Sequence, residues 1–238
     1  MSKIFITGST DGIGFLAAKQ LLKEGHEVHL HARNDKRASD LRQKLEKEAP
    51  VLTADLSDIN QIRRLARELN DFGPYDAIIH NAGVISVPSE VIFTVNVLAP
   101  YLLTKLVEKP ERLVYLSSSL HRGGNAFESE LNLQEVNYSD SKLYLTTLMR
   151  VFAQKNPELY INAVDPGWVP TKMGGSSAPD DLKKGYETQV WLATGQDREV
   201  LVSGKYFYHK KQQIPNSLID NEAFQERLLA VCEAYSRE

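Results

Sequence analysis

The sequence predicts an α/β domain in which a mostly parallel sheet is covered by helices on both faces. Short apolar segments of strand length alternate with longer amphipathic segments from the first residues to about Ser217. Strands and helices that alternate this regularly imply right-handed crossovers between parallel strands. The 238 residues contain no linker, repeat or low-complexity tract, so we expect one domain spanning residues 1–238.

The first two strand and helix pairs set the pattern. "KIFIT" (3–7) is a buried strand by composition, and residues 12–24 follow with apolar side chains at helical spacing. "EVHLHA" (27–32) is the second strand, and residues 35–49 form a charged helix whose apolar stripe contains Ala38, Leu41 and Leu45. The same alternation predicts strands at 51–54, 76–80, 112–117, 159–164 and 205–209, and helices at 59–71, 89–108, 139–155, 180–194 and 219–236.

Composition excludes several classes of function. Apolar residues make up 42% and charged residues 25% of the chain, and a net charge of −3 gives no general attraction for nucleic acid or anionic lipid. The single cysteine, Cys232, and six scattered histidines do not form a metal-binding pattern. We find neither a signal peptide nor a run of about 18 apolar residues, and so we expect a cytoplasmic protein without a membrane segment or metal.

The loop after the first strand, "TGSTDGIG", carries glycines at positions 8, 12 and 14. Glycines allow the backbone to approach a pyrophosphate closely, and the start of the next helix offers free N–H groups to the anion. The spacing is neither that of the general dinucleotide fingerprint nor that of a Walker loop. The simpler alternative is a glycine-rich turn without a ligand.

The end of the second strand favours one dinucleotide over the other. In "LHARND", Arg33 directly follows the strand, and the nearest acid, Asp35, is expected to cap the next helix. An arginine at this point pairs with a 2′-phosphate, whereas a carboxylate would bind a 2′-hydroxyl. The sequence therefore favours NADP(H) over NAD(H), and the alternative for Arg33 is a solvent-facing loop charge.

Three tyrosines precede a lysine by four residues: Tyr101, Tyr138 and Tyr206. This spacing brings two side chains within about 6 Å on a helix but separates them by roughly 13 Å on a strand. Tyr206 lies on the expected last strand, and Tyr101 lies in mid-helix away from any strand end. Only Tyr138 and Lys142 begin a helix that follows a serine-bearing strand, on the side of the sheet where ligands bind.

Four segments in this order resemble the classical short-chain dehydrogenase/reductase family: "TGSTDGIG" (7–14), "HNAG" (80–83), "YLSSS" (115–119) with "YSDSK" (138–142), and "DPGWVPT" (165–171). The closing "SGKYF" (203–207) is similar to the retinol-dehydrogenase-like branch. The resemblance implies a seven-stranded Rossmann fold with strand order 3-2-1-4-5-6-7. It also implies nicotinamide-dependent oxidation of alcohols or reduction of carbonyls.

The resemblance assigns site residues by position. It implies the catalytic residues Asn96, Ser118, Tyr138 and Lys142. Asn96 would position a water near the lysine, or be an ordinary polar helix residue; Asp55 would contact the adenine, or be a helix cap. The candidate cofactor-binding residues are Gly8, Ser9, Thr10, Gly12, Ile13, Gly14, Arg33, Asp55, Leu56, Asn81, Ala82, Gly83, Tyr138, Lys142, Pro166, Gly167, Val169 and Thr171.

The chemistry expected of Tyr138 and Lys142 depends on the pKa of the tyrosine. Tyr138 would protonate the alkoxide formed when a carbonyl accepts hydride, and would act as the base in the reverse direction. Free tyrosine has a pKa of about 10. A cation about 4 Å away at an effective dielectric of about 20 contributes about 4 kcal/mol, enough to lower that pKa by about three pH units. Lys142 is therefore expected to bring the pKa of Tyr138 toward neutrality, while a serine hydroxyl, Ser118 by the family register, donates to the oxyanion.

Two segments are expected to shape the substrate site. Residues 121–137 would fold as an excursion over the site and contribute contacts such as His121 or Phe127, and residues 172–179 would form a mobile flap. The expected pocket walls are Phe127, Trp168, Met173 and Trp191, which indicate a partly apolar carbonyl or alcohol substrate. The family resemblance allows a homodimer or homotetramer that pairs through helices 89–108 and 139–155.

The sequence therefore predicts an NADP(H)-preferring carbonyl reductase or alcohol dehydrogenase. Two alternatives remain open: an epimerase or dehydratase that uses the same Tyr-Lys pair with tightly held cofactor, and a non-catalytic nucleotide-sensing protein. Net consumption of NADPH with a carbonyl substrate separates the first alternative from the prediction. An intact set of catalytic residues argues against the second.

Overall fold

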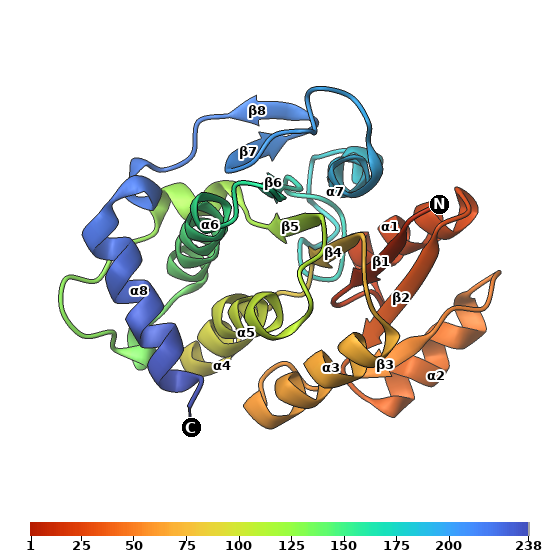
Figure 1. The fold of residues 1–238 in the computed structure, drawn as a ribbon, viewed down its shortest axis with the longest axis horizontal. Coiled ribbons are helices and arrows are strands. Elements are labelled where there is room, and N and C mark those ends of the chain that lie inside the picture. Colours follow the sequence, from red (N-terminus) through yellow and green to blue (C-terminus); the bar gives the residue numbers. More distant parts are fainter. Residues whose placement is uncertain (238) are drawn as a thin grey trace.

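A twisted sheet forms the centre of the molecule (Figure 1). The computed structural model describes residues 1–237. In these residues the strands are β1 (Lys3–Ile6), β2 (Glu27–Ala32), β3 (Val51–Thr53), β4 (Ala77–His80), β5 (Arg112–Leu116), β6 (Tyr160–Asp165), β7 (Lys205–Tyr208) and β8 (Lys211–Gln213). Their order is β3-β2-β1-β4-β5-β6-β7-β8, which confirms the predicted order of the first seven.

The eighth strand extends the predicted sheet. β8 pairs antiparallel with β7 across a tight turn in which His209 and Lys210 have φ angles of 46° and 62°. All other neighbouring strands in the described part of the chain are parallel. Because the side chains of β8 are exposed, its "KQQ" sequence carries no apolar pattern from which a strand could be predicted.

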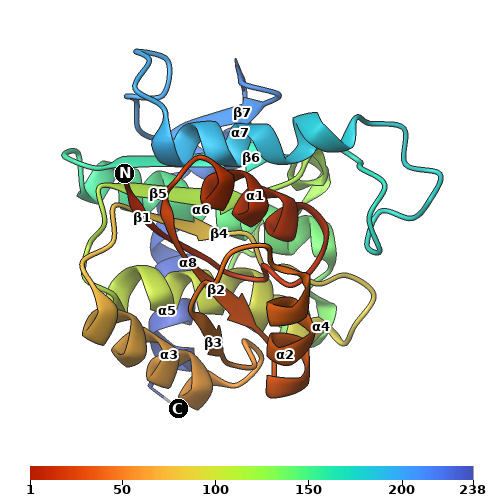
Figure 2. The same cartoon turned by 90° about the vertical axis from the view of Figure 1, so that its right-hand side faces the viewer.

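Helices cover both faces of the sheet (Figures 1 and 2). Ile4 and Ile6 pack toward one face and Phe5 toward the other, as the two-residue period of a strand requires. One face carries α1 (Gly12–Lys23), α2 (Asp35–Lys44) and α7 (Leu182–Thr194). The other carries α3 (Ile59–Phe72), α4 (Ser89–Phe93), α5 (Ala99–Leu106) and α6 (Tyr138–Lys155).

The predicted helix 89–108 is interrupted by one turn of π-helix. Residues Thr94–Leu98 form this turn between α4 and α5. Asn96 lies in the turn, and π-turns within helices occur frequently at functional sites. The second predicted helix also ends early, at Lys44, and begins with Asn34 as its cap instead of Asp35.

The last helix, α8 (Glu222–Tyr235), lies outside α6 and α5 (Figure 1). Phe224 packs against Tyr144 of α6 with ring centroids 5.7 Å apart, and Glu233 accepts a 2.7 Å hydrogen bond from Tyr101 of α5. As a result, side chains from Asp140 to Ala153 are buried except for the half-buried Arg150. Helix α6 is therefore covered on all sides along most of its length.

A capping box fixes the first residue of α6. The Asn137 side chain accepts a 3.0 Å hydrogen bond from Asp140 N, and the Asp140 carboxylate accepts one of 3.2 Å from Asn137 N. Helix α6 therefore begins at Tyr138, at the carboxyl-end edge of the sheet. Within residues 1–237, no helix has both the length and the apolar character needed to cross a bilayer.

Candidate active site

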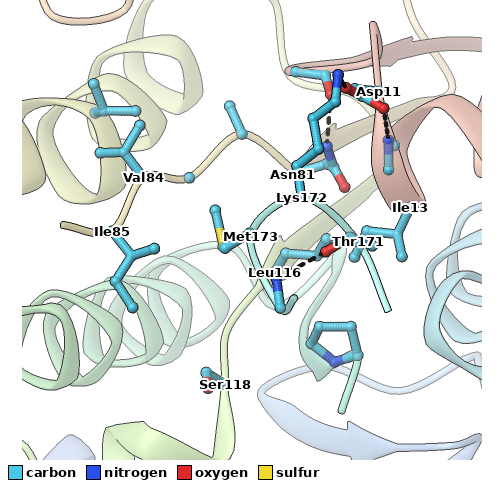
Figure 3. Close-up of a pocket in the computed structure, with 18 of the residues that line it drawn as sticks. Asp11, Ile13, Asn81, Val84, Ile85, Leu116, Ser118, Thr171, Lys172 and Met173 are labelled. Carbon is cyan, nitrogen blue, oxygen red and sulfur yellow. Dashed lines mark hydrogen bonds and ion pairs between the residues drawn. The ribbon is translucent and has the colours of Figure 1, made fainter. Parts of the chain in front are cut away.

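A cavity of about 790 Å³ opens at the carboxyl ends of the parallel strands. Its size lies within the range of about 300–1,000 Å³ found for small-molecule and cofactor sites. Figure 3 shows part of its wall, with side chains contributed by the loops after β1, β4, β5 and β6. It is lined by these predicted site residues: Gly8, Thr10, Gly12, Ile13, Gly14, Arg33, Asp55, Leu56, Asn81, Ala82, Gly83, Ser118, Tyr138, Lys142, Pro166, Gly167, Val169 and Thr171.

The loop after β1 is held in a conformation that needs glycine. Gly8 and Gly12 have φ angles of 65° and 55°, which residues other than glycine rarely adopt. At Gly14, a Cβ atom would lie 2.3 Å from Asn81 Nδ2 and 2.7 Å from Gly8 O. The third glycine therefore allows α1 to pack directly against the end of β4.

Asn81 links this loop to β4. Its Nδ2 atom donates hydrogen bonds to Thr7 O at 2.9 Å and to Gly8 O at 3.1 Å. Its Oδ1 atom is buried and has no hydrogen-bond partner among the described residues. An acceptor of this kind in a cavity wall is suited to a ligand that brings a donor.

Ser9 does not line the cavity, so its cofactor contact stays a prediction that the structure does not support. The residue is fully buried, and its hydroxyl donates to Ile6 O at 3.1 Å. The same oxygen accepts from His31 N at 2.9 Å, and Ser9 N donates to His31 O at 3.2 Å. Ser9 fastens the end of β1 to β2, and its polar groups are engaged there.

His31 is a site residue that the sequence reasoning missed. Its Nδ1 atom accepts a 3.0 Å hydrogen bond from Gly8 N, and its Nε2 atom lies 2.9 Å from Ala54 O. Burial lowers the pKa of His31 to about 4, so the ring is neutral at physiological pH and Nδ1 remains an acceptor. The signal was a histidine at an inward position of the second strand, directly beside the glycine loop.

Two arginines line the cavity near the end of β2. Arg33 Nε donates to Asp55 Oδ2 at 2.9 Å, and Arg37, in the first turn of α2, donates to the Thr10 hydroxyl at 3.4 Å. The sequence reasoning missed Arg37, because a charged residue near the start of a helix is usually a solvent-facing one.

Asp55 is not the cap of the following helix, because Asp58 fills that position. Its Oδ1 atom accepts from Ser57 N at 3.0 Å and from the Ser57 hydroxyl at 2.6 Å. Burial opposes ionisation of Asp55, but hydrogen bonds from Ser57 and Arg33 lower its pKa overall. The cavity wall at this end therefore holds a carboxylate that is already paired.

Tyr138, Lys142 and Ser118 meet at the centre of the cavity wall. The Lys142 ammonium lies 5.5 Å from the Tyr138 ring centroid and donates a 2.7 Å hydrogen bond to Leu116 O, at the end of β5. Ser118 follows two residues later, and its hydroxyl accepts from Leu120 N at 3.3 Å. Ser117 points elsewhere, because its hydroxyl is buried 2.7 Å from that of Thr146.

The pKa values of this pair differ from the expectation. Burial raises the pKa of Tyr138 to about 12, Asp165 adds to the increase, and the Ser118 hydroxyl opposes it. Burial lowers the pKa of Lys142 to about 8, and Asp165 opposes that change. The predicted lowering of the Tyr138 pKa by Lys142 is thus wrong in this structure, because both groups are desolvated and the ammonium is turned toward Leu116 O. At neutral pH Tyr138 holds its proton.

Asn96 lies behind the cavity wall and does not line it. Its Oδ1 atom accepts from Val84 N at 2.8 Å, while Nδ2 donates to Val84 O at 3.0 Å and to the Ser141 hydroxyl at 3.0 Å. A Cβ atom on Gly83 would lie 3.3 Å from Lys142 Nζ and 3.5 Å from Asn96 Oδ1. Asn96 therefore braces the loop after β4 close to the ammonium group, which an ordinary polar helix residue would not do.

The other two Tyr-Lys pairs lie away from the cavity. Tyr101 and Lys105 both donate to Glu233 Oε2 at 2.7 Å, so that pair attaches α8 to α5. Tyr206 packs against His121 in a tilted arrangement with ring centroids 4.6 Å apart, and Lys210 is exposed in the turn between β7 and β8. Both observations agree with the expectation that these two pairs lie away from the ligand side of the sheet.

The excursion 121–137 does not cover the cavity as predicted. His121 is buried; its Nδ1 atom lies 2.7 Å from Ser118 O, and its Nε2 atom accepts from Asn216 N at 3.0 Å. Phe127 packs edge-on against Tyr144 and Phe224, at 5.7 and 5.6 Å between ring centroids. The excursion runs toward α8, and neither His121 nor Phe127 lines the cavity.

The apolar wall of the cavity was predicted in part. Trp168 and Met173 line it, whereas Trp191 packs against Phe207 on the far side of the sheet. The residues missed in this wall are Val84, Ile85, Val87, Val91, Val95 and Leu120. Several follow "HNAG" directly in the sequence, so the signal was an apolar run just beyond a strand end.

The segment after β6 contacts the glycine loop. Lys172 forms an ion pair with the Asp11 carboxylate, as Figure 3 shows. Asp11 also accepts from Gly12 N at 2.9 Å at the start of α1. This contact closes one side of the cavity, and the mobility expected for residues 172–179 stays a prediction.

The fold and the residues of this cavity agree with one family. A family model described as short chain dehydrogenase matches residues 2–182, about three quarters of the chain. This protein belongs to the short-chain dehydrogenase/reductase family. It is accordingly an NAD(P)-dependent enzyme, and it is similar to the retinol-dehydrogenase-like branch.

Individual relatives align with nearly the whole of this chain. The chain is 37% identical to short-chain dehydrogenase chry4 of Gibberella zeae, over 98% of this chain and 96% of the relative. It is 28% identical to retinol dehydrogenase 14 of Mus musculus, over 92% and 82% of the two chains. The solved structure of the Pseudomonas aeruginosa RhlG/NADP active-site complex has a TM-score of 0.71 at 22% identity, covering 87% and 94%.

Proposed function

We propose that the whole chain is one NADP(H)-preferring oxidoreductase domain that interconverts a carbonyl and an alcohol, with Tyr138 as the general acid and base. One observation carries this proposal. Tyr138, Lys142 and Ser118 converge on one cavity wall, whereas the other two Tyr-Lys pairs lie outside the cavity. Convergence of a proton donor, a cation and a hydroxyl suits a reaction that develops negative charge on oxygen.

The chemistry assigned to this chain's own residues is proton transfer. Because its pKa is about 12, Tyr138 is protonated at neutral pH and is ready to donate to a forming alkoxide. Ser118 is proposed to donate a hydrogen bond to the same oxygen, and the Lys142 ammonium, 5.5 Å from the Tyr138 ring centroid, is proposed to stabilise the phenolate left on Tyr138 during the reaction. Asn96 holds the adjoining loop and is proposed to position a water next to Lys142.

The residues present fit a nicotinamide dinucleotide. The glycines after β1, the N-terminal end of α1 and the unpartnered Asn81 Oδ1 offer both donors and an acceptor to it. When bound, the nicotinamide supplies or accepts the hydride. Gly8, Gly12 and Gly14 are proposed to approach the pyrophosphate, and Pro166, Val169 and Thr171 the carboxamide end.

Arg33 and Arg37 support the preference for NADP(H). Both line the cavity, and the two carboxylates there, Asp11 and Asp55, are paired with Lys172 and Arg33. A phosphate would therefore meet guanidinium groups without facing an unpaired carboxylate. The RhlG complex, which contains NADP, is consistent with this assignment.

We expect the ratio of kcat/KM for NADPH to that for NADH to exceed about 10, since a charge-assisted contact contributes about 1.5–3 kcal/mol. Arg37→Ala should reduce this ratio about tenfold by raising the KM for NADPH alone. Lys36→Ala is the matched control, because Lys36 is exposed on the same helix but does not line the cavity. Equal use of both cofactors by the unmodified enzyme would contradict the preference.

The substrate half of the cavity is apolar. Val84, Ile85 and Met173 line the same cavity as Ser118 (Figure 3), and Leu120 and Trp168 add to this wall. Leu120, Trp168 and Met173 are about half exposed, so apolar surface continues to the mouth. We infer a substrate with an apolar body next to its carbonyl or hydroxyl group.

We propose that the enzyme is a monomer in place of the dimer that the family resemblance allows. Helix α8 covers the faces of α5 and α6 through which such a dimer would form. Sedimentation at increasing concentration should give a mass near 26.8 kDa throughout. A stable dimer that crosslinks between two copies of α6 would overturn this assignment.

The direct test of the proposed function is a panel of carbonyls and alcohols that range from short and polar to bulky and apolar. Each compound is assayed with NADPH, NADH and the oxidised forms in parallel. We expect turnover with NADPH that increases with the apolar size of the carbonyl substrate. Turnover confined to small charged substrates would contradict the apolar wall.

A further inference from the structure

Asp165 is a buried carboxylate next to the catalytic pair, and no role has been assigned to it above. It is the last residue of β6 and is 4% exposed. Ala163 packs on the α6 face of the sheet and Val164 on the opposite face. Because side chains alternate along a strand, Asp165 points to the α6 face, which carries Tyr138 and Lys142.

The neighbouring strand places Lys142 close to Asp165. Leu116 of β5 pairs with Val164 of β6, one residue before Asp165. The Lys142 ammonium donates its hydrogen bond to Leu116 O, so it lies at the end of the adjacent strand, on the face to which Asp165 points. The ammonium and the carboxylate therefore lie at the ends of neighbouring strands, on the same face of the sheet, and the charge of Asp165 acts on Lys142.

Gly167 N and the Tyr206 hydroxyl interact with the Asp165 carboxylate, and neither group carries a positive charge. The Asp165 Oδ1 atom accepts a 2.9 Å hydrogen bond from Gly167 N. Among the described residues, no lysine, arginine or histidine nitrogen comes within 4.0 Å of its carboxylate. A buried carboxylate without a contacting cation is costly, and such a cost is common where a charge serves the chemistry.

Titratable groups face Asp165 from each element packed around it. Helix α6 contributes Tyr138 and Lys142, β7 contributes Tyr206 and Tyr208, and the turn Ser119–Gly123 contributes His121 and Arg122. Asp180, which accepts a 2.7 Å hydrogen bond from Trp168 N, is a second carboxylate that acts on Tyr208. Lys142 and Arg122 are thus the lysine and the arginine in this group.

We propose that Asp165 is a positioning residue for the reaction: its carboxylate keeps Lys142 in the ammonium form beside Tyr138. The part of this inference that concerns turnover rests on the proposed function of the Tyr138 and Lys142 pair. The effect of Asp165 on the protonation of Lys142 does not depend on that function, because it is a property of the folded chain. With a neutral residue at position 165, the buried Lys142 would lose its proton more readily.

The sign of the effect can be worked out for both partners. The Asp165 charge raises the pKa of Lys142 against the lowering caused by burial, and it raises the pKa of Tyr138 together with burial. Removing the charge must therefore lower both pKa values. Lys142, with a pKa of about 8, would then be largely neutral near pH 8, and the phenolate on Tyr138 would lose its cation.

The test is a titration of Lys142 in the intact protein, followed by NMR of the carbon next to its amine. The Lys142 signal is assigned by its absence in Lys142→Arg. We expect Asp165→Asn, which keeps an oxygen for Gly167 N, to move the titration about one unit toward lower pH. Asp165→Ser is a second neutral variant with a hydrogen-bond acceptor, so the result does not depend on one substitution folding.

Asp180→Asn is the matched control. It removes a carboxylate that braces the same turn, but Asp180 is not among the groups that act on Tyr138 or Lys142. An unchanged Lys142 titration in the folded Asp165 variants, or an equal change in Asp180→Asn, would overturn the proposal.

Turnover provides a second, separate readout. If carbonyl reduction is observed, the alkaline limb of kcat/KM in Asp165→Asn should move about one unit toward lower pH, with little change in the KM for NADPH. A wild-type enzyme without turnover would reject the proposed function while the Lys142 titration still decides the role of Asp165. An unchanged pH profile in an active, folded Asp165→Asn enzyme would reject that role alone.

Discussion

Replacing Tyr138 by phenylalanine is expected to lower kcat for carbonyl reduction by about 10³–10⁴ while NADPH still binds. The substitution removes only the phenolic hydroxyl, which is the group placed to protonate the alkoxide. The Lys142 ammonium keeps its 2.7 Å hydrogen bond to Leu116 O, so the cavity wall should persist. Steady-state kinetics and a fluorescence titration with NADPH measure the two quantities separately.

Tyr101→Phe is the matched control for this experiment. Tyr101 has a lysine at the same spacing, but its hydroxyl donates to Glu233 of α8, outside the cavity. We expect this variant to keep kcat within about twofold and to lose about 0.5–1.5 kcal/mol of stability with the hydrogen bond. Comparable losses of kcat in both variants would mean that Tyr138 has no special role in the chemistry.

Replacing Gly14 by alanine is expected to lower the free energy of unfolding by about 1–3 kcal/mol. Helix propensity alone predicts the opposite sign, since alanine is favoured over glycine in a helix by about 1 kcal/mol. In α1, however, the new methyl group would lie 2.7 Å from Gly8 O, a backbone atom that cannot move without shifting the loop. The clash should therefore outweigh the propensity.

The same substitution should weaken NADPH binding at least about tenfold, because the loop that it displaces lines the cavity. Urea unfolding and NADPH titration measure the two effects. Gly123→Ala is the matched control, since a Cβ atom there meets nothing within 4 Å. A Gly14→Ala protein that is as stable as the wild type, with unchanged NADPH affinity, would show that α1 does not need this close approach.

The sheet could be predicted because its strands are buried on both faces and read as apolar runs. Ile78 and Ile79 illustrate this, since they belong to the cores on opposite faces of β4. The site could be located because polar residues follow the ends of parallel strands, which meet at one edge. β8 lacked such a signal, because its side chains are exposed.

The details that failed depend on tertiary packing. The excursion 121–137 carries apolar residues, and nothing local indicates that Phe127 packs against Phe224, about a hundred residues later, instead of a substrate. Ser9 lies in a loop predicted to bind the cofactor, yet its hydroxyl is hydrogen-bonded to β1 and β2. The lowered pKa expected for Tyr138 assumed partial solvation, whereas the structure buries the pair.

We propose that hydride passes from the nicotinamide to the carbonyl carbon while Tyr138 supplies the proton to the carbonyl oxygen. The most direct measurement uses NADPH deuterated at the transferred position, with a bulky apolar ketone or aldehyde as substrate. We predict that one NADPH is consumed for each alcohol formed, and that the deuterium appears on the former carbonyl carbon. Product formation without consumption of NADPH, as in an epimerase that recycles its cofactor, would contradict the assignment.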